Sequence, residues 1–314
     1  LSRGLGDVYK RQLLASDMPA LLDHTRRMIF LESREMAVVT QTGASFFTLE
    51  GVPIQKEVHV MPLDPVAVAK GGYKHFMQKE IYEQSRSVTD AIRGRVDFDQ
   101  AVVYLEDLHI DPEVLRRVNK IYSVACGTAW HSALVGKFMV EELARVRVEV
   151  DYSSEFRYRD LLLDEGTLFL AVTQSGETVD TLAAMDQARE AGIKTLAIVN
   201  VMGSEASRVA DGVMYMRAGL EIGVAASKTF TSQMILHYLL ALYLGQIRGT
   251  IKKERMGELL HDLVELPNLV GQVLEDGTDY EALANEYFKR ENFLYLGRGI
   301  NYPIALEGAL KLKE

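Results

Sequence analysis

Cysteine is almost absent from the sequence, which has a single thiol, Cys126, among 314 residues. One cysteine excludes an internal disulfide framework, so we expect a protein of a reducing compartment, the cytoplasm. Long apolar runs are also missing, because no stretch reaches the roughly 18 residues of a membrane span and none resembles a secretory signal. These absences exclude a disulfide-stapled secreted domain and a membrane protein.

Positive charge is scarce as well. The 35 Lys and Arg residues face 44 Asp and Glu residues, which gives a formal net charge of -9. No block of Lys or Arg forms a basic patch, which argues against a general nucleic-acid binder. A small anionic ligand would therefore have to be bound by local hydrogen-bond donors.

Signatures of metals and nucleotide cofactors are lacking too. The seven histidines are scattered, and no Cys or carboxylate joins them at the spacing of metal ligands. The turn Gly297-Arg298-Gly299 lacks the third glycine of a dinucleotide fingerprint. We therefore expect neither a metal site nor a cofactor.

What the sequence does contain is a core-forming pattern, with 48% hydrophobic residues in a chain long enough for two or more domains. Short apolar runs alternate with helical patterns from residue 121 onward, which predicts an α/β fold with a doubly wound parallel sheet and helices on both faces. The expected strands are residues 121–125, 146–150, 168–172, 195–199 and 213–215. Long helices are expected up to about residue 246 and over residues 252–274.

One turn dominates this pattern. Residues 173–178 (TQSGET) follow the buried run 167–172 and open a helical pattern. Hydroxyl and amide side chains, Gly176 and the unpaired N–H groups of a helix start would suit a phosphate. The same residues are equally typical of a helix N-cap without a ligand, in which Ser175 or Thr178 satisfies backbone donors.

A second turn at a strand end begins at Cys126. No Cys/His/Asn signature surrounds this thiol, so we expect a small core residue rather than a nucleophile. His131 follows in the next helical turn, and a Cys-His pair remains the alternative. Because ligands of parallel sheets bind at the carboxyl ends of strands, the two turns are expected to converge on one crevice.

The last helical pattern, residues 304–314, carries Glu307, Lys311 and Glu314 at i, i+4 and i+7. This spacing places two carboxylates and an amine on one helix face. A surface salt-bridge ladder is one interpretation. The other is an ion pair that tunes a general base, since the helix follows a predicted strand (residues 293–296) and a Gly-Arg-Gly turn.

Several blocks in one order resemble the glutamine:fructose-6-phosphate aminotransferases, or glucosamine-6-phosphate synthases. They cover residues 25–27, 77–84, 126–128, 154–159, 174–178, 221–225 and 302–314. The resemblance runs from about residue 13 to residue 314. It implies glutamine-dependent conversion of fructose 6-phosphate to glucosamine 6-phosphate, the first step of amino-sugar biosynthesis, by a homodimer joined through sugar isomerase (SIS) domains.

The chain is also expected to divide into several parts. The tail of its first segment (GDVYKRQ, residues 6–12) resembles a translated sequencing adapter, so we treat that segment as non-native. Apolar runs at 29–31, 36–39 and 46–49 predict antiparallel strands, which the family resemblance assigns to the remnant of a glutaminase domain. A linker with one helix over residues 73–93, a first SIS domain and the start of a second SIS domain follow. The respective ranges are 1–12, 13–70, 71–105, 106–250 and 251–314.

The resemblance to the aminotransferase family also implies the site residues. Glu314 would be the base of the isomerisation, and Lys311 and Glu307 would complete its polar network. The residues that would bind the sugar phosphate are Thr128, Thr173, Gln174, Ser175, Thr178 and Val224. Ala129 and Ala226 replace serines that are frequent in the family, so one or two sugar contacts are expected to be lost or water-mediated.

The family's N-terminal cysteine nucleophile and its last SIS residues have no counterpart in this chain, so we expect an internal fragment that is inactive alone. Its partners would be fructose 6-phosphate and ammonia released from glutamine. Two alternatives stay open: a stand-alone SIS-type sugar-phosphate isomerase or deaminase, and a non-enzymatic sugar-phosphate sensor. The first would lack a glutaminase remnant, and the second would need a DNA-binding module.

Overall fold

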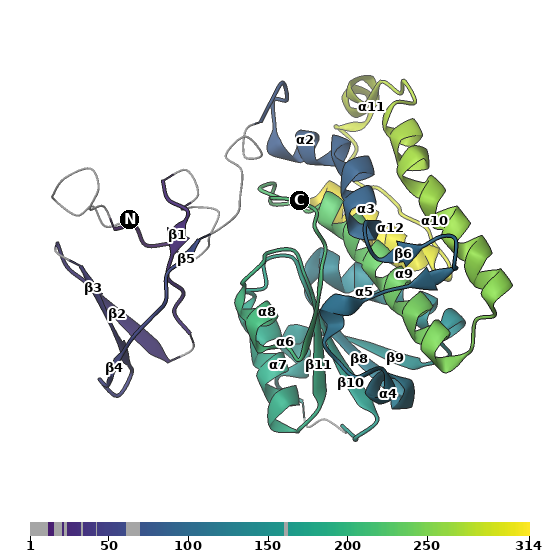
Figure 1. Cartoon of the computed structure of the whole chain (residues 1–314). Helices are drawn as coiled ribbons and strands as arrows, with labels where there is room; N and C mark the ends of the chain where they lie inside the picture. Colours follow the sequence, from purple (N-terminus) through teal and green to yellow (C-terminus); the bar gives the residue numbers. More distant parts are fainter. Residues whose placement is uncertain are drawn as a thin grey trace. The chain divides into compact units, whose positions relative to one another are not determined.

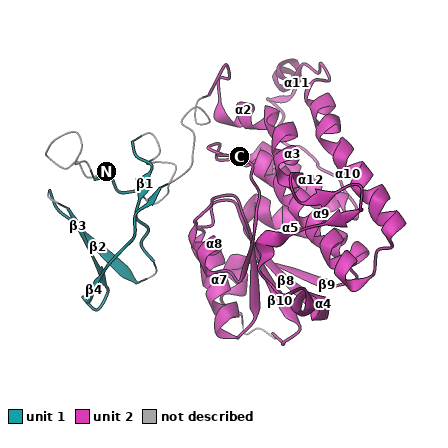
Figure 2. Cartoon of the chain, viewed as in Figure 1, with its two compact units in different colours: residues 1–69 teal, residues 70–314 magenta. Residues whose placement is uncertain are grey.

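The structure, a computed structural model, describes residues 12–15, 21, 24–32, 34–41, 43–60, 70–159 and 163–314. The chain divides into two compact units, unit 1 (residues 1–69) and unit 2 (residues 70–314), which Figure 2 shows in different colours. Most of the adapter-like segment, residues 1–11, lies outside the described residues. The predicted domain boundaries at 105 and 250 both fall inside unit 2 and stay predictions.

Unit 1 contains short antiparallel strands. β2 (Glu35–Val39), β3 (Ala44–Thr48) and β4 (Pro53–Ile54) form one sheet, and β1 (Arg27–Met28) pairs with β5 (His59–Val60). The antiparallel prediction is confirmed, but the apolar run 29–31 is not a strand, because the pairing with β5 ends at Met28. The assignment of this unit to a glutaminase domain stays a prediction.

Unit 2 is built on a five-stranded sheet in which every neighbouring pair is parallel and the order is β12-β11-β10-β8-β9. Its strands are β8 (Lys120–Ala125), β9 (Arg147–Tyr152), β10 (Thr167–Thr173), β11 (Lys194–Val199) and β12 (Gly212–Tyr215). All five predicted strands are confirmed, with ends that differ by at most two residues from the expected ranges.

Helices cover both faces of this sheet, as the doubly wound prediction requires (Figure 1). In β10, Leu168, Leu170 and Val172 belong to one core cluster, whereas Phe169 and Ala171 belong to the other. Complete burial of an aliphatic or aromatic side chain contributes about 1.5–3 kcal/mol, so both faces stabilise the strand. On the first face lie α5 (Gly127–Leu143), α9 (Lys228–Arg248) and α10 (Lys253–Leu274), and on the second α6 (Ser153–Phe156), α7 (Val179–Glu190) and α8 (Glu205–Val209).

The segment before the sheet differs from its prediction. Two helices, α2 (Phe76–Tyr82) and α3 (Gln84–Ile92), replace the single helix expected over residues 73–93, and Glu83 separates them. The two helices differ in the side chains that they bury, which are mainly apolar in α3 and a single carboxylate in α2. α3 places Val88, Ala91 and Ile92 in the core, whereas α2 buries only Glu80.

The remaining elements of unit 2 are short or peripheral. They are β6 (Val96–Asp97), β7 (Val102–Val103), η3 (Glu106–Leu108), α4 (Pro112–Arg117), α11 (Tyr280–Tyr287) and α12 (Asn301–Lys313). The strand predicted over residues 293–296 is wrong: the segment has no strand pairing, and Leu294 and Leu296 are exposed. A strand needs a hydrogen-bonded neighbour, and no described strand pairs with this segment.

Candidate functional site

The strand order creates a crevice at the carboxyl end of the sheet. β9 lies beside β8 on one side and β10 beside β8 on the other, so the winding reverses between β8 and β10. The helices that follow these two strands, α5 and α7, consequently pack on opposite faces. Open α/β sheets bind ligands at such a reversal, between the turns that follow the two strands.

The first of these turns joins β8 to α5. Ala125 ends the strand and is fully buried, whereas Cys126, the N-cap of α5, is half-buried. The prediction that Cys126 is a core residue is therefore wrong, because the burial ends one residue earlier. Gly127 follows with φ 55°, and Thr128 Oγ1 donates a hydrogen bond to Glu307 Oε1 at 3.0 Å.

The second turn joins β10 to α7. Thr173 Oγ1 accepts the Gly176 N–H at 3.2 Å, and Ser175 Oγ accepts the Glu177 N–H at 3.1 Å. Thr178 is the N-cap of α7 but makes no side-chain capping bond. Gly176 has φ 73°, and a Cβ atom there would lie 2.1 Å from Ser204 Oγ, so only glycine fits.

The third wall is the pocket loop, which we define as residues 216–227 between β12 and α9. The Glu221 carboxylate accepts the N–H groups of Ser227 and Thr229 at 2.9 and 3.3 Å, and also the Thr229 hydroxyl. These bonds close the loop onto the start of α9. Val224 is 99% exposed within it, so its side chain is available to a ligand.

The fourth wall is α12, where the predicted i, i+4 geometry is present. Lys311 Nζ lies 3.4 Å from both Glu307 Oε1 and Glu314 Oε2. Glu307 is buried, and its Oε2 lies 2.7 Å from His131 Nδ1 on α5. The side chains are 7%, 23% and 39% exposed from Glu307 through Lys311 to Glu314, so the row leads from the core to the surface.

These walls enclose a cavity of about 280 Å³. That volume is near the lower end of small-ligand sites, which span about 300–1,000 Å³. Seven of the nine predicted site residues line it: Thr128, Thr173, Gln174, Ser175, Thr178, Val224 and Glu314. The other two do not line the cavity. Lys311 contacts Glu314, and Glu307 accepts a hydrogen bond from Thr128. Ala129 and Ala226 also line the cavity and supply no hydroxyl there.

Sequence reasoning missed several polar residues of the site. His131 is not paired with Cys126 but contacts Glu307, 176 positions away along the chain. Gln233 lines the cavity and accepts a hydrogen bond from Ser132 Oγ at 2.7 Å. The only available signal was that Gln233 directly precedes the apolar run 234–236, since a buried amide requires a partner.

Burial changes the acidity of one lining residue. Desolvation raises the pKa of Glu221, and the nearby Glu80 carboxylate acts in the same direction, although hydrogen bonds from Thr229 and Ser227 oppose both effects. The loop therefore contributes a carboxyl group that ionises less readily than one in water. Because this carboxyl group accepts hydrogen bonds from the backbone N–H groups of Ser227 and Thr229, we expect it to hold the loop in place.

Among the residues that the structure describes, no group of three His, Cys, Asp or Glu side chains is arranged to hold a metal ion. Within the same residues, no helix has the length and hydropathy needed to cross a membrane.

Comparison with known sequences identifies two kinds of match. The SIS domain family matches residues 114–243. The glutamine–fructose-6-phosphate aminotransferase [isomerizing] of Clostridium tetani is 42% identical over 311 residues, which is 99% of this chain and 51% of the relative. The enzyme of the same name from Clostridium acetobutylicum is 43% identical over 301 residues, 96% of this chain and 49% of the relative. The chain thus spans about half the length of these relatives.

A solved structure agrees with the sequence matches. The C-terminal domain of glucosamine-fructose-6-phosphate aminotransferase from Francisella tularensis superposes with a TM-score of 0.74 at 34% sequence identity. The match covers 78% of this chain and 68% of that domain. It extends over most of unit 2, so the two chains share both the sheet and the helices around it.

Proposed function

Because the chain belongs to the family of isomerising glutamine–fructose-6-phosphate aminotransferases, we propose that it forms the sugar-phosphate-binding part of such an enzyme. The substrates would be fructose 6-phosphate and ammonia released from glutamine, and the product would be glucosamine 6-phosphate. The observation that carries this proposal is the cavity at the reversal of the sheet, lined by the hydroxyl-rich turn Thr173 to Thr178.

The phosphate would bind at the start of α7. Backbone N–H groups at a helix N-terminus and the helix dipole both attract an anion. Thr178 leaves these N–H groups without a side-chain cap, and Ser175, which lines the cavity, adds a hydroxyl donor. Hydrogen bonds of this kind can bind an anion despite the net charge of -9. The Thr128 hydroxyl donates to Glu307, so its oxygen is left to accept a hydrogen bond from the sugar.

Glu314 would transfer the proton in the isomerisation. After ammonia replaces the C2 carbonyl oxygen of the ketose as an imine and water leaves, the carboxylate takes a proton from C1 while the imine nitrogen gains one. A proton is then returned at C2 while the C1 hydroxyl loses its proton. The product is then an aldehyde at C1 with an amino group at C2. Lys311 Nζ lies 3.4 Å from Glu314 Oε2 and would hold this carboxylate beside the cavity, and Glu307 in turn holds Lys311 in place.

The extent of the sequence match supports this function over the alternatives. The SIS family match begins at residue 114, whereas the aminotransferase relative from Clostridium tetani matches 99% of the chain, unit 1 included. A stand-alone isomerase or deaminase would need no such additional region. A DNA-binding sensor would need a basic surface, which the composition does not favour.

We extend the proposal to the setting of the enzyme: a homodimer joined through its SIS domains, located in the cytoplasm. A single cysteine is compatible with a reducing compartment. Light scattering of the purified full-length protein tests the dimer, and a monomeric mass at micromolar concentration would contradict it.

Calorimetry with fructose 6-phosphate tests the binding site in the full-length protein that contains this chain. Ser175→Ala should weaken binding about ten- to hundred-fold, because a hydrogen bond to a charged group contributes about 1.5–3 kcal/mol. Ser207→Ala is the matched control, since that hydroxyl donates to the Ser204 carbonyl and does not line the cavity. Equal affinities of Ser175→Ala and parent would remove Ser175 from the phosphate site.

A further inference from the structure

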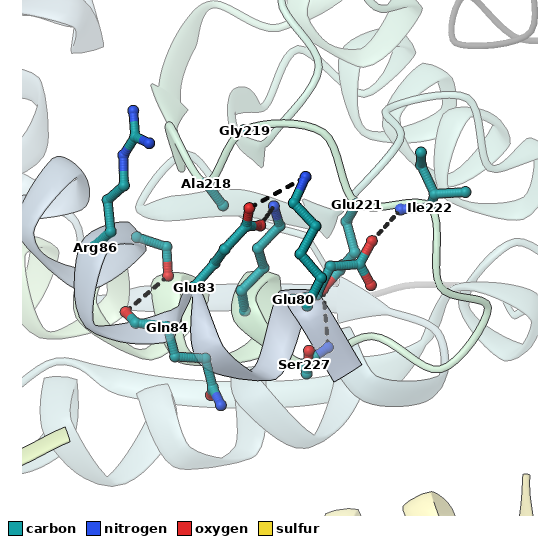
Figure 3. A network of polar contacts seen from close by, with 12 residues as sticks. Glu80, Glu83, Gln84, Arg86, Ala218, Gly219, Glu221, Ile222 and Ser227 are labelled. Atoms are coloured by element: carbon teal, nitrogen blue, oxygen red, sulfur yellow. Dashed lines mark hydrogen bonds and ion pairs between the residues drawn. The ribbon is translucent and has the colours of Figure 1, made fainter. Parts of the chain in front are cut away.

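Helix α2 makes direct hydrogen bonds to the pocket loop. Glu80 is only 2% exposed, and its Oε1 accepts the Ile222 N–H at 2.6 Å. Figure 3 shows this contact between Glu80 and Ile222. The Gly223 N–H is shared between Oε1 and Oε2 of the same carboxylate, at 3.1 and 3.2 Å. A buried carboxylate needs such donors, and here two consecutive backbone amides of the loop supply them.

The packing at this contact leaves no room for a different arrangement. A Cβ atom on Gly223 would lie 2.5 Å from Glu80 Oε2 and 3.3 Å from Met77 Cα. The loop backbone therefore lies directly against both the side chain and the backbone of α2. Any larger residue at 223 would push the loop away from the helix.

A second contact fixes the end of the loop. Lys228, the first residue of α9, is 3% exposed, and its Nζ lies 2.7 Å from Glu83 Oε2. Burial would raise the pKa of Glu83, but the hydrogen bond and charge of Lys228, together with the charge of Lys79, outweigh it and lower the pKa. Glu83 thus stays ionised beside Lys228 at neutral pH.

The opposite side of the same loop is a wall of the cavity. Glu221, Gly223, Val224 and Ala226 line the cavity, while the backbone at 222 and 223 is bonded to Glu80. Gly223 thus belongs both to the α2 contact and to the cavity wall. A shift of α2 therefore moves the cavity wall with it.

We propose that α2 sets the position of the pocket loop, so that Glu80 and Glu83 are positioning residues for sugar-phosphate binding. This rests on the proposed function, because the loop is assigned to a sugar-phosphate site. Neither carboxylate lines the cavity, so they act on the ligand through Val224 and its neighbours. Glu80 fixes the middle of the loop at Ile222 and Gly223, and Glu83, the C-cap of α2, fixes Lys228, the α9 residue that directly follows the loop.

Glu80→Gln in the full-length protein tests the first contact. A carboxamide accepts only through its oxygen, so with that oxygen in the place of Oε1 its NH2 group would stand in the place of Oε2, 3.2 Å from Gly223 N, where one donor faces another. Amide hydrogen exchange of residues 219–227 should quicken about ten-fold, and the Kd for fructose 6-phosphate should rise about ten-fold. Asp90→Asn is the matched control, because Asp90 lies on α3 and pairs there with Arg86 and Arg93; both quantities should stay at the parental value.

A charge exchange tests the second contact. Glu83→Lys and Lys228→Glu should each weaken fructose 6-phosphate binding, and the double variant should recover part of the loss, because the opposite charges again face each other. A residue that merely stabilised the fold would lower the melting temperature without changing the Kd measured well below it. Recovery of affinity in the double variant is therefore specific to the positioning role.

The outcomes separate this proposal from the proposed function. If the parent protein does not bind fructose 6-phosphate, the proposed function fails, and the positioning role for that ligand fails with it. If the parent binds and Glu80→Gln binds equally well, the positioning role alone is overturned, whatever the exchange rates are. If Glu80→Gln does not fold, the charge-exchange series decides, and absence of recovery overturns the proposal.

Discussion

Glu80 lies behind the pocket loop and Glu314 lines the cavity, and the two carboxylates have opposite surroundings. Glu80 is buried and accepts two backbone N–H groups, so its oxygens are occupied by the protein itself. Glu314 lines the cavity, its side chain is 39% exposed, and its nearest cation is Lys311 at 3.4 Å. A carboxylate of the first kind holds a structure, whereas one of the second kind can exchange a proton with a ligand.

Glu314→Gln gives the largest expected effect, and it tests the reactive side of this comparison. The variant keeps the shape of the side chain but cannot accept a proton. Synthesis of glucosamine 6-phosphate by the full-length protein should fall by about a hundred-fold or more, while fructose 6-phosphate still binds. The measurement is turnover with saturating fructose 6-phosphate and ammonia.

The control for this variant is Glu258→Gln, since Glu258 is exposed and pairs with Arg255 on α10. It should leave turnover unchanged. Near-parental turnover of Glu314→Gln under the same conditions would contradict the catalytic role of Glu314. Glu307, Lys311 and Glu314 would then be interpreted as a salt-bridge ladder.

Glu307→Ala tests the structural end of the same helix face. The substitution leaves Thr128, His131 and Lys311 without the carboxylate that they share. Removing one member of a buried polar network should lower the free energy of unfolding by about 2–3 kcal/mol, measured by urea denaturation. Glu314→Gln should change it by only about 0.5 kcal/mol, because that residue is exposed. Similar losses in both variants would break the distinction between the two carboxylates.

His237 extends the comparison to a buried group without a partner. Burial lowers the pKa of His237 to about 4, and no described residue bonds to its Nε2. An unfolded histidine titrates near pH 6.5, so between about pH 6.5 and 4 the unfolded state binds more protons. Stability should therefore be complete above pH 6.5 and decline as the pH falls towards 4.

The expected loss through His237 is about 2 kcal/mol at pH 5 relative to pH 7, measured by denaturant unfolding at both values. His237→Gln should lack this part of the pH dependence. His261→Gln, which changes an exposed histidine of α10, should retain it. Identical pH profiles for the parent and His237→Gln would show that the acid sensitivity lies elsewhere.

The sequence predicts best where structure depends on neighbours along the chain. The apolar run before Thr173 defines β10 because a parallel strand covered on both faces needs only buried residues. The i, i+4 and i, i+3 spacings likewise predict the contacts of Lys311 with Glu307 and with Glu314. Both patterns are local and require no knowledge of what packs against them.

Prediction fails where a partner lies far away in the sequence. Glu80 resembles any charged residue of an amphipathic helix until Ile222, 142 positions later, lies against it. Lys228 and Glu83 are 145 positions apart, and their burial cannot be read from either segment alone. The error at Cys126 is of a different kind, since it depends on whether a strand ends one residue earlier or later.

The bond between His131 and Glu307 has a consequence for synthesis of the chain on the ribosome. The sheet is complete once residue 215 has emerged, but the cavity needs Glu307 and Glu314, which are made about a hundred residues later. Glu307 contacts His131 and Thr128, which lie 176 and 179 positions earlier in the sequence. Such contacts form late in folding, because the intervening chain must first be ordered. A nascent chain would thus carry a finished sheet before the proposed site is complete, and that site would form only when residues 307–314 have been made.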